Sequence, residues 1–294
     1  MTVSIGNTVF ASDHNTLRGE VNQWFGDQNP SMAFGNAAQT QGWGGSMDPI
    51  VSIGDLIEAA DYNSLIDRCN IGTDIVNVVS GALTYVVAGN LIYAVDHNTI
   101  EAKSDSIFTN RNNIEVAEMS TGGAGSSARV ANYSTAIDCT FRYTFSSFAK
   151  ARYFWNSGGA VYISGDITGY TLGWGWDGQG VNQVLTNMGT IIMDYTSNNG
   201  TVPSIGFYDL TTAYQTIYSG AGAGAYTNTY INIGARYGGS GAYVELRATI
   251  TPDPARTVDG TTTMRTAYRK LDNQSSGGAS LSITAPAYSL INPL

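Results

Sequence analysis

The sequence predicts an α+β protein that is mostly β, with a region of short helices followed by an antiparallel β-sandwich. Three copies of one short pattern, each containing a helix-start signal, lie within the first 100 residues. From Val130 onward, alternating apolar and polar residues separated by Gly, Pro and Asn predict a succession of short strands. A length of 294 residues fits two units at roughly 100 to 200 residues per domain. We therefore expect a helical region over residues 1–121 and a sandwich over residues 122–294.

The repeated pattern reads Gly-[Asn/Asp]-x-[Val/Ile]-x-Ala-x-Asp-[His/Tyr]-Asn-[Ser/Thr]-[Leu/Ile], and its copies span residues 6–17, 54–65 and 89–100. Gly before Asn or Asp suits a tight turn. The later Asp is a favoured N-cap, because its carboxylate accepts a hydrogen bond from an unpaired amide of the first helical turn. The expected N-caps are Asp13, Asp61 and Asp96. Apolar spacings of three and four then predict helices over 15–24, 63–79 and 98–116, with Gly72 as a candidate break in the second.

Two stretches rich in Gly and small polar residues predict irregular structure. Residues 35–48 are expected to form a loop or spacer, and residues 120–127, which lack an apolar anchor, are expected to separate the two regions. Two later segments flanked by glycines, 149–156 and 181–188, predict short helices. The predicted strands cover 137–145, 160–167, 189–194, 204–208, 214–218, 228–237, 243–251, 261–270 and 281–283.

The composition excludes several classes of protein. Charged residues make up 13% of the chain, about half of their share in a typical soluble domain, and the net charge is −9, so no basic face is expected to bind nucleic acid. No apolar run is long enough to span a membrane, and the N-terminus does not resemble a signal peptide, so we expect synthesis and retention in a cytoplasm. The two cysteines, Cys69 and Cys139, are expected as separate reduced thiols.

The repeats also raise two site hypotheses. The Asp-x-Asn element suggests calcium, but a helix-loop-helix calcium loop needs Gly at its sixth position and an acid at its twelfth, where the chain has Arg18 and Trp24 after Asp13. The only histidines, His14 and His97, share their place in the repeat with Tyr62, which indicates packing or a hydrogen bond and argues against a catalytic base. We expect no metal and no cofactor.

Other motifs give no catalytic constellation. The stretch from Gly173 to Gly178 has the spacing of a dinucleotide-binding loop, but such a loop must join a parallel strand to a full helix, and antiparallel strand signals surround this one. No nucleophile elbow, zinc pair or P-loop is present, and we expect no enzyme activity. Acids for a glycosidase pair exist, although nothing singles out two of them. They are Asp166, Asp177, Asp194 and Asp209.

Three tryptophans are candidate ligand or interface residues. Trp155, Trp174 and Trp176 could stack on sugar rings if they are exposed. In a chain with few charges, Tyr and Trp more often belong to cores and subunit interfaces.

Four ordered motifs carry a resemblance to a known family. They lie at residues 151–159 (Ala-Arg-Tyr-Phe-Trp-Asn-Ser-Gly-Gly), 185–191, 205–211 and 258–261. Together with the Ala-x-Asp-x-Asn-x-Leu repeats, they are similar to virion structural proteins of tailed phages, common in viruses of cyanobacteria and other aquatic bacteria. The resemblance covers most of the chain and implies a tail, fibre, baseplate or neck component without catalytic residues. The strand starting Ala160-Val161-Tyr162 is less charged than that family's pattern.

We therefore expect a non-enzymatic virion component, made in the host cytoplasm, that contacts other virion proteins and copies of itself in a trimer or ring. The repeats would attach it, and the C-terminal residues 285–294 would lie as an arm on a neighbour or, alternatively, on their own sandwich. A carbohydrate- or receptor-binding module of the phage particle is the alternative function, and it requires exposed Trp174 and Trp176. A depolymerase would require two acids about 5–10 Å apart in a cleft.

Overall fold

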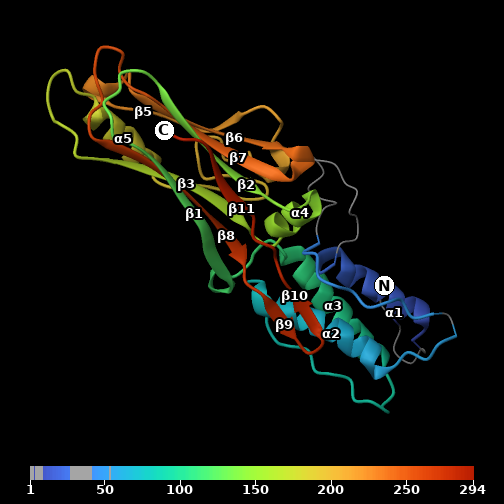
Figure 1. Cartoon of the computed structure of the whole chain (residues 1–294). Coiled ribbons are helices and arrows are strands. Elements are labelled where there is room, and N and C mark those ends of the chain that lie inside the picture. Colours follow the sequence, from blue (N-terminus) through green and yellow to red (C-terminus); the bar gives the residue numbers. More distant parts are fainter. Residues whose placement is uncertain (1–2, 4–8, 27–41, 53) are drawn as a thin grey trace. The chain divides into compact units, whose positions relative to one another are not determined.

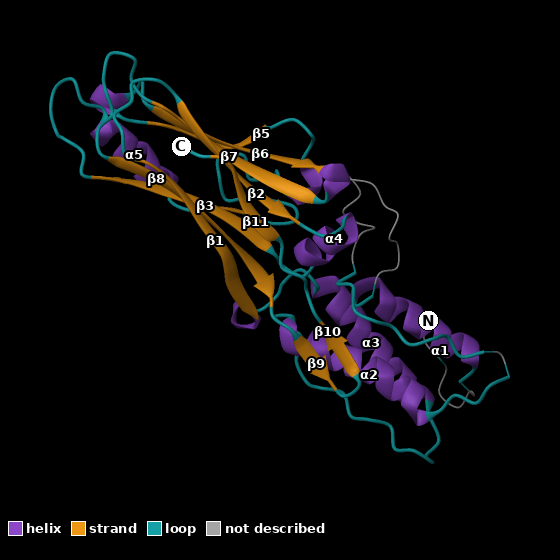
Figure 2. Cartoon of the chain, viewed as in Figure 1, coloured by secondary structure: helices purple, strands orange, loops and turns teal. Residues whose placement is uncertain are grey.

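The computed structural model describes residues 3, 9–26, 42–52 and 54–294, which form two compact units (Figure 1). Unit 1 comprises Met1–Ser120, Arg152–Gly158 and Leu271–Thr284, and unit 2 comprises Thr121–Ala151, Gly159–Lys270 and Ala285–Leu294. The first boundary between the units lies between Ser120 and Thr121, one residue before the expected boundary. The two later segments of unit 1 were not expected from the sequence. The predicted α+β class is confirmed, with strands dominating the C-terminal part (Figure 2).

Unit 1 is built on three helices that carry the repeats. Its elements are α1 (Ala11–Trp24), α2 (Ala59–Ile75), α3 (Ala94–Asn110), the second half of α4 (Phe148–Asn156), β9 (Gln274–Ser276) and β10 (Ala279–Leu281). Strands β9 and β10 form an antiparallel hairpin that packs on α2. Within the expected spacer, residues 35–41 lie outside the described residues. Trp43 that follows is fully buried, and its amide donates to Trp24 O at 3.0 Å.

Each helix begins four residues earlier than predicted. The Asp of each repeat was expected as the N-cap residue. It instead occupies the third helical position, and the N-cap residue lies three positions before it. The physical reason is that a carboxylate in the first turn can also reach back to the N-cap amide, as in one half of a capping box. The second helix is not broken at Gly72 but continues to Ile75.

The three helices run parallel and meet through equivalent positions. Counted from each helix start, residues 4, 7, 11 and 14 are buried in all three helices, a spacing of three and four that is typical of a coiled coil. The four layers are His14, Tyr62 and His97; Leu17, Leu65 and Ile100; Val21, Cys69 and Ser104; and Trp24, Gly72 and Ile107.

In the last layer, side chains of very different size pack together. Trp24 fills it and donates from Nε1 to Ser104 Oγ of the layer before, at 2.9 Å. A Cβ on Gly72 would lie 2.8 Å from Ile107 Cδ1 and 3.1 Å from Trp24 Cζ3. Gly72 is therefore required for close packing, because a large indole occupies the space that an equivalent side chain would need.

Unit 2 is a sandwich of two antiparallel sheets with one helix. The four-stranded sheet has the order β1-β8-β3-β4 and the five-stranded sheet the order β11-β2-β7-β6-β5. Helix α5 (Gly178–Met188) packs against β3, β5 and β6. The strands are β1 (Met119–Arg129), β2 (Ile137–Thr144), β3 (Ala160–Thr168), β4 (Ile191–Met193), β5 (Gln215–Ala221), β6 (Tyr230–Gly238), β7 (Tyr243–Thr251), β8 (Thr261–Leu271) and β11 (Ala287–Asn292).

The core of unit 2 lies between the two sheets. Alternate residues of β2 and β7 are buried on one side, and those of β3 and β8 on the other. Tyr143 of β2 joins the sheets, because its hydroxyl lies 2.8 Å from Thr266 Oγ1 of β8. Cys139 is buried in the same core and forms no disulfide. Cys69, buried in unit 1, forms none either.

Three expectations for this part of the chain are wrong. Residues 120–127 form most of β1, and their glycines lie under aromatic rings, since a Cβ on Gly125 would lie 2.1 Å from Tyr288 Cζ. Residues 204–208 form no strand but a turn and the 3-10 helix Phe207–Asp209. Of the two places expected for residues 285–294, a neighbour is wrong and their own sandwich is confirmed, because β11 pairs with β2 as an edge strand of the five-stranded sheet.

A buried carboxylate ties three strands together on the five-stranded sheet. Glu245 of β7 accepts hydrogen bonds from Arg142 of β2 at 2.5 Å, from Arg236 of β6 at 2.6 Å and from Tyr214 at 2.7 Å. Burial opposes ionisation of Glu245, but these donors hold the pKa of its carboxyl below the ordinary value.

Candidate functional site

The candidate site is the end of unit 1 where all three repeats meet. It consists of the first turns of α1, α2 and α3 and the described repeat residues just before them, and we call it the open end. Each repeat's Asp accepts a hydrogen bond there from the backbone amide of the N-cap residue. Asp13 accepts from Phe10 at 2.8 Å, Asp61 from Glu58 at 2.7 Å, and Asp96 from Tyr93 at 2.8 Å. The three predicted capping residues thus all hold the first helical turn, although from the third helical position.

The repeats are fastened to one another by asparagines in a closed ring. The side-chain amide of Asn15 bonds both backbone groups of Val51, at 2.7 and 3.0 Å. Asn63 does the same with Val86, at 2.9 and 2.7 Å. Asn98 does so with Val3, at 2.9 and 2.9 Å. The first repeat is thereby joined to the second, the second to the third, and the third back to the first.

This ring gives unit 1 an approximate threefold axis running along the helices. Every asparagine reaches the Val that lies three residues before the next copy of the repeat, so the three links are equivalent. Equivalent residues also meet at both ends of the bundle, since His14 contacts Tyr62 near the start of the helices and Gly72 adjoins Trp24 and Ile107 near the other. The surface at the open end is therefore assembled from three similar parts around one axis.

The floor of the open end is a buried aromatic cluster. The His14 and Tyr62 rings meet edge to face with centroids 5.2 Å apart, and Tyr62 Oη lies 3.0 Å from His97 Nδ1. Burial, with a smaller contribution from the carboxylates of Asp13 and Asp96, raises the pKa of the Tyr62 phenol. The phenol therefore stays protonated and can donate to His97. The sequence predicted packing or a hydrogen bond at this position: His14 packs on Tyr62, and Tyr62 and His97 share a hydrogen bond.

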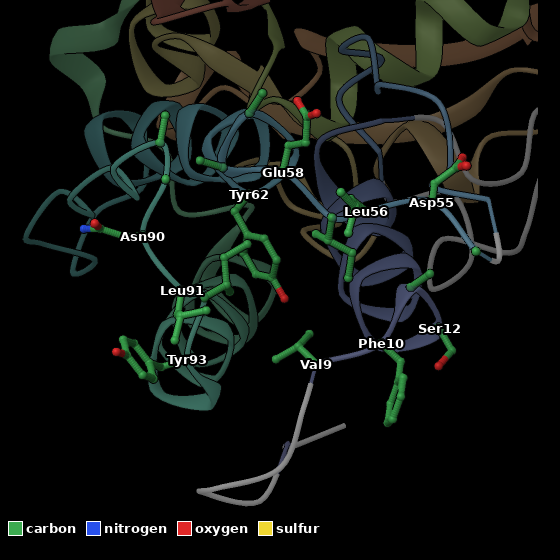
Figure 3. A pocket seen from close by; sticks show the side chains of 18 residues that line it. Val9, Phe10, Ser12, Asp55, Leu56, Glu58, Tyr62, Asn90, Leu91 and Tyr93 are labelled. Carbon is green, nitrogen blue, oxygen red and sulfur yellow. The ribbon is translucent and has the colours of Figure 1, made fainter.

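Above this floor the surface is hollow and mostly apolar. The hollow has a volume of about 1140 Å³ and is lined by residues 9–12, 54–60, 62 and 88–93. Val9, Leu56 and Leu91 surround Tyr62 in Figure 3, one from each repeat. Leu56 is 86% exposed and Leu91 74%, and Phe10 and Tyr93 at the rim are about as exposed. So much exposed apolar area in one place is typical of a surface that another molecule covers.

The charge at the open end is negative. The hollow's only ionisable acids are Asp55 and Glu58, both exposed, and no Lys or Arg is among its described lining residues. The three capping aspartates lie in the first turns of the same helices. These carboxylates place negative charge at the helix N-termini, which disfavours an anionic ligand there.

The three candidate tryptophans lie in different surroundings. Trp155 is fully buried in unit 1, edge to face with Phe154, and so cannot offer a stacking surface. In unit 2, Trp174 is fully exposed and Trp176 is partly buried. Their loop is anchored on both sides, by the Thr171 amide donating to Asp259 at 2.7 Å and the Thr257 amide donating to Gly175 O at 3.1 Å.

The four candidate acids each serve the fold. Asp166 pairs with Arg265 at 3.0 Å. Asp177 is buried and accepts from Thr229 Oγ1 and from the Asp253 amide. Asp194 accepts from the amides of residues 196 and 197, and Asp209 from that of residue 206.

The described residues contain neither a candidate metal centre nor a candidate membrane span. No group of three or more His, Cys, Asp and Glu side chains there could hold a metal ion. No described helix is both long and apolar enough to cross a membrane.

The asparagine ring was missed at the sequence level, although a signal was present. The tetrapeptide Val-Ser-Ile-Gly occurs at residues 3–6 and again at 51–54, and Val-Val-Ala-Gly occupies 86–89. The repeat thus begins three residues earlier than the template, with the Val that each asparagine binds.

Comparison with protein-family models, curated proteins and solved structures found no match to this chain.

Proposed function

We propose that this protein is a non-enzymatic structural component of a tailed-phage virion, placed in the tail, and that it docks onto another protein through the open end of unit 1. The observation that carries the proposal is the exposed apolar lining of the hollow. Leu56 and Leu91 contribute little to the stability of unit 1, because most of their surface faces solvent. Apolar side chains kept exposed around a hollow are better explained by a partner than by folding.

Two further features support an assembly role. The low share of charged residues leaves few Lys and Glu to keep surfaces apart, and interfaces are depleted in those residues. The open end is also pre-organised, because the capping aspartates and the asparagine ring hold the described residues of the three repeats before any partner arrives. Binding at a rigid surface loses less conformational entropy than binding by a flexible segment.

The test is incorporation into particles. Phage would be grown with wild-type protein or with the double variant Leu56→Asp/Leu91→Asp, and the copies per purified particle would be counted by quantitative mass spectrometry. We expect the double variant to be lost from particles by roughly tenfold or more. Val116→Asp is a matched control, since Val116 is 69% exposed in unit 1 but does not line the hollow. Normal incorporation of the double variant would contradict docking through this end.

A second candidate, a receptor-binding module of the particle, is favoured by one observation. Trp174 is fully exposed on a loop that is anchored on both sides, so it could stack on a sugar ring of a host surface glycan. Trp174→Ala should then abolish binding of the purified protein to host cells, while Val130→Ala, at a similarly exposed site of unit 2, leaves binding unchanged. Equal binding of both variants would remove this candidate.

A further inference from the structure

We infer that the open end docks onto the threefold axis of a homotrimeric protein whose contact face is apolar near the axis and carries Lys or Arg around it. The inference rests on the proposed function and names the partner of the same site. Three observations lead to it: the cyclic arrangement of the repeats, the distribution of exposed apolar residues among them, and the charge of the rim.

The cyclic arrangement is the first argument. The asparagine links close after three steps, so equivalent backbone segments of the three repeats surround one axis. A surface of this kind fits a partner with the same rotational symmetry, because every contact made by one partner subunit is repeated approximately by the other two.

The exposed residues supply the second argument. A partner without threefold symmetry needs apolar contacts from one part of the rim only. Here every repeat exposes at least one large apolar side chain, Phe10 in the first, Leu56 in the second, and Leu91 with Tyr93 in the third. Among the described residues at these two positions of the repeat, only Glu58 is not a large apolar or aromatic side chain.

The likeness of the repeats is also concentrated at this end. The twelve-residue template ends in the second helical turn, and beyond it the three helices share buried positions but few residue types. Residues 18–20 read Arg-Gly-Glu, whereas 66–68 read Ile-Asp-Arg and 101–103 read Glu-Ala-Lys. The bundle thus remains threefold where its surface is exposed and hollow, and is asymmetric at the far end, where Trp24 faces Gly72.

Charge decides between a foreign trimer and a second copy of this chain. Two copies meeting at their open ends would bring Asp55 and Glu58 of one against the same acids of the other. Like charges brought together at an interface cost affinity, whereas Lys or Arg around the apolar centre of a partner would complement them. Among the described lining residues there is no Lys or Arg with which a second copy could balance these acids.

The experiment moves the acidic N-cap residue, Glu58, by one step around the axis and leaves Asp55 in place. In the triple variant Phe10→Tyr/Glu58→Phe/Tyr93→Glu, each N-cap position takes the residue of another repeat, so the composition of the rim is kept. After a turn of one third, a threefold partner meets the same three N-cap side chains in the same order. We expect this variant to enter particles to within roughly twofold of wild type, while Leu56→Asp/Leu91→Asp is reduced by roughly tenfold or more. Circular dichroism of each purified variant checks that it is folded.

Two further measurements complete the test. Cross-linked complexes from purified particles should contain three partner chains for each copy of this protein. A particle reconstruction made without imposed symmetry should place the axis of unit 1 on a threefold axis. Loss of the triple variant together with the Leu56/Leu91 variant, or a location off such an axis, overturns the inference and leaves the proposed function standing. Normal incorporation of the Leu56/Leu91 variant overturns both.

Discussion

Replacing Gly72 with Ala gives the most direct test of the layered packing of unit 1. In the interior of an exposed helix this change stabilises by about 1 kcal/mol, because Ala loses less backbone entropy than Gly. At Gly72, however, the new methyl would lie 2.8 Å from Ile107 Cδ1 and 3.1 Å from Trp24 Cζ3. Ordinary carbon contacts are about 3.5–4.0 Å, and overpacking of this kind costs about 1–3 kcal/mol. We expect a net loss of about 1 kcal/mol in the free energy of unfolding.

A matched control and a double-mutant cycle make the result specific. Gly19 lies in α1 with nothing within 4 Å of an added Cβ, so Gly19→Ala should stabilise by up to about 1 kcal/mol. Ile107→Ala alone should cost about 2–5 kcal/mol. In the Gly72→Ala/Ile107→Ala variant the new methyl occupies part of that cavity, so the total should fall short of the sum by about 1–2 kcal/mol.

The assay is denaturant unfolding followed by tryptophan fluorescence, since Trp24 and Trp43 are both fully buried in unit 1. The reasoning is refuted if Gly72→Ala stabilises the protein as much as Gly19→Ala does. It is equally refuted if the effects of Gly72→Ala and Ile107→Ala simply add, because Gly72 would then not share space with Ile107.

Three other predictions concern single groups. Asp61→Ala should lower the free energy of unfolding by about 0.5–2 kcal/mol, measured by denaturant unfolding, because the Glu58 amide loses its acceptor. Burial raises the pKa of the Cys69 and Cys139 thiols to about 12, so neither should react with iodoacetamide at pH 8 until denaturant is added. The pKa of the Glu245 carboxyl is lower in the folded protein than in the unfolded chain. Its ionised form therefore stabilises unit 2 fully at pH values above the unfolded-state pKa, and this stabilisation is lost as the pH falls through the folded-state pKa. Glu245→Gln should accordingly make the stability less dependent on pH below about pH 4.5, measured by acid unfolding.

The sequence predicted most of the regular elements because their signals are local. Alternation identified seven strands, including β2, β3, β6, β7 and β8, within a few residues, and the glycine-flanked segments became α4 and α5. The repeats identified the three helices. Their starts were displaced because an Asp can hold a helix start either from the N-cap or from the third position, and spacing alone does not distinguish the two.

What the sequence could not give depends on distant partners. The Gly- and Ser-rich residues of β1 have no apolar pattern of their own, and they form a strand because neighbouring tyrosines pack over their glycines. The open end was anticipated only as an attachment region. Its hollow is formed by segments from three copies of the repeat, and nothing within one copy shows that Asn63 binds Val86 or that Tyr62 meets both histidines.

The parallel course of the three helices has a consequence for how unit 1 forms. Three such helices on separate chains would assemble at a rate that depends on protein concentration and would dissociate on dilution. Here the described segment 76–93 returns the chain along α2, a helix of 17 residues about 25 Å long, and helices held in one chain meet at a high effective concentration. Formation of the bundle is therefore a first-order event within one molecule. A chain synthesised in a single copy can complete its open end before it encounters anything else.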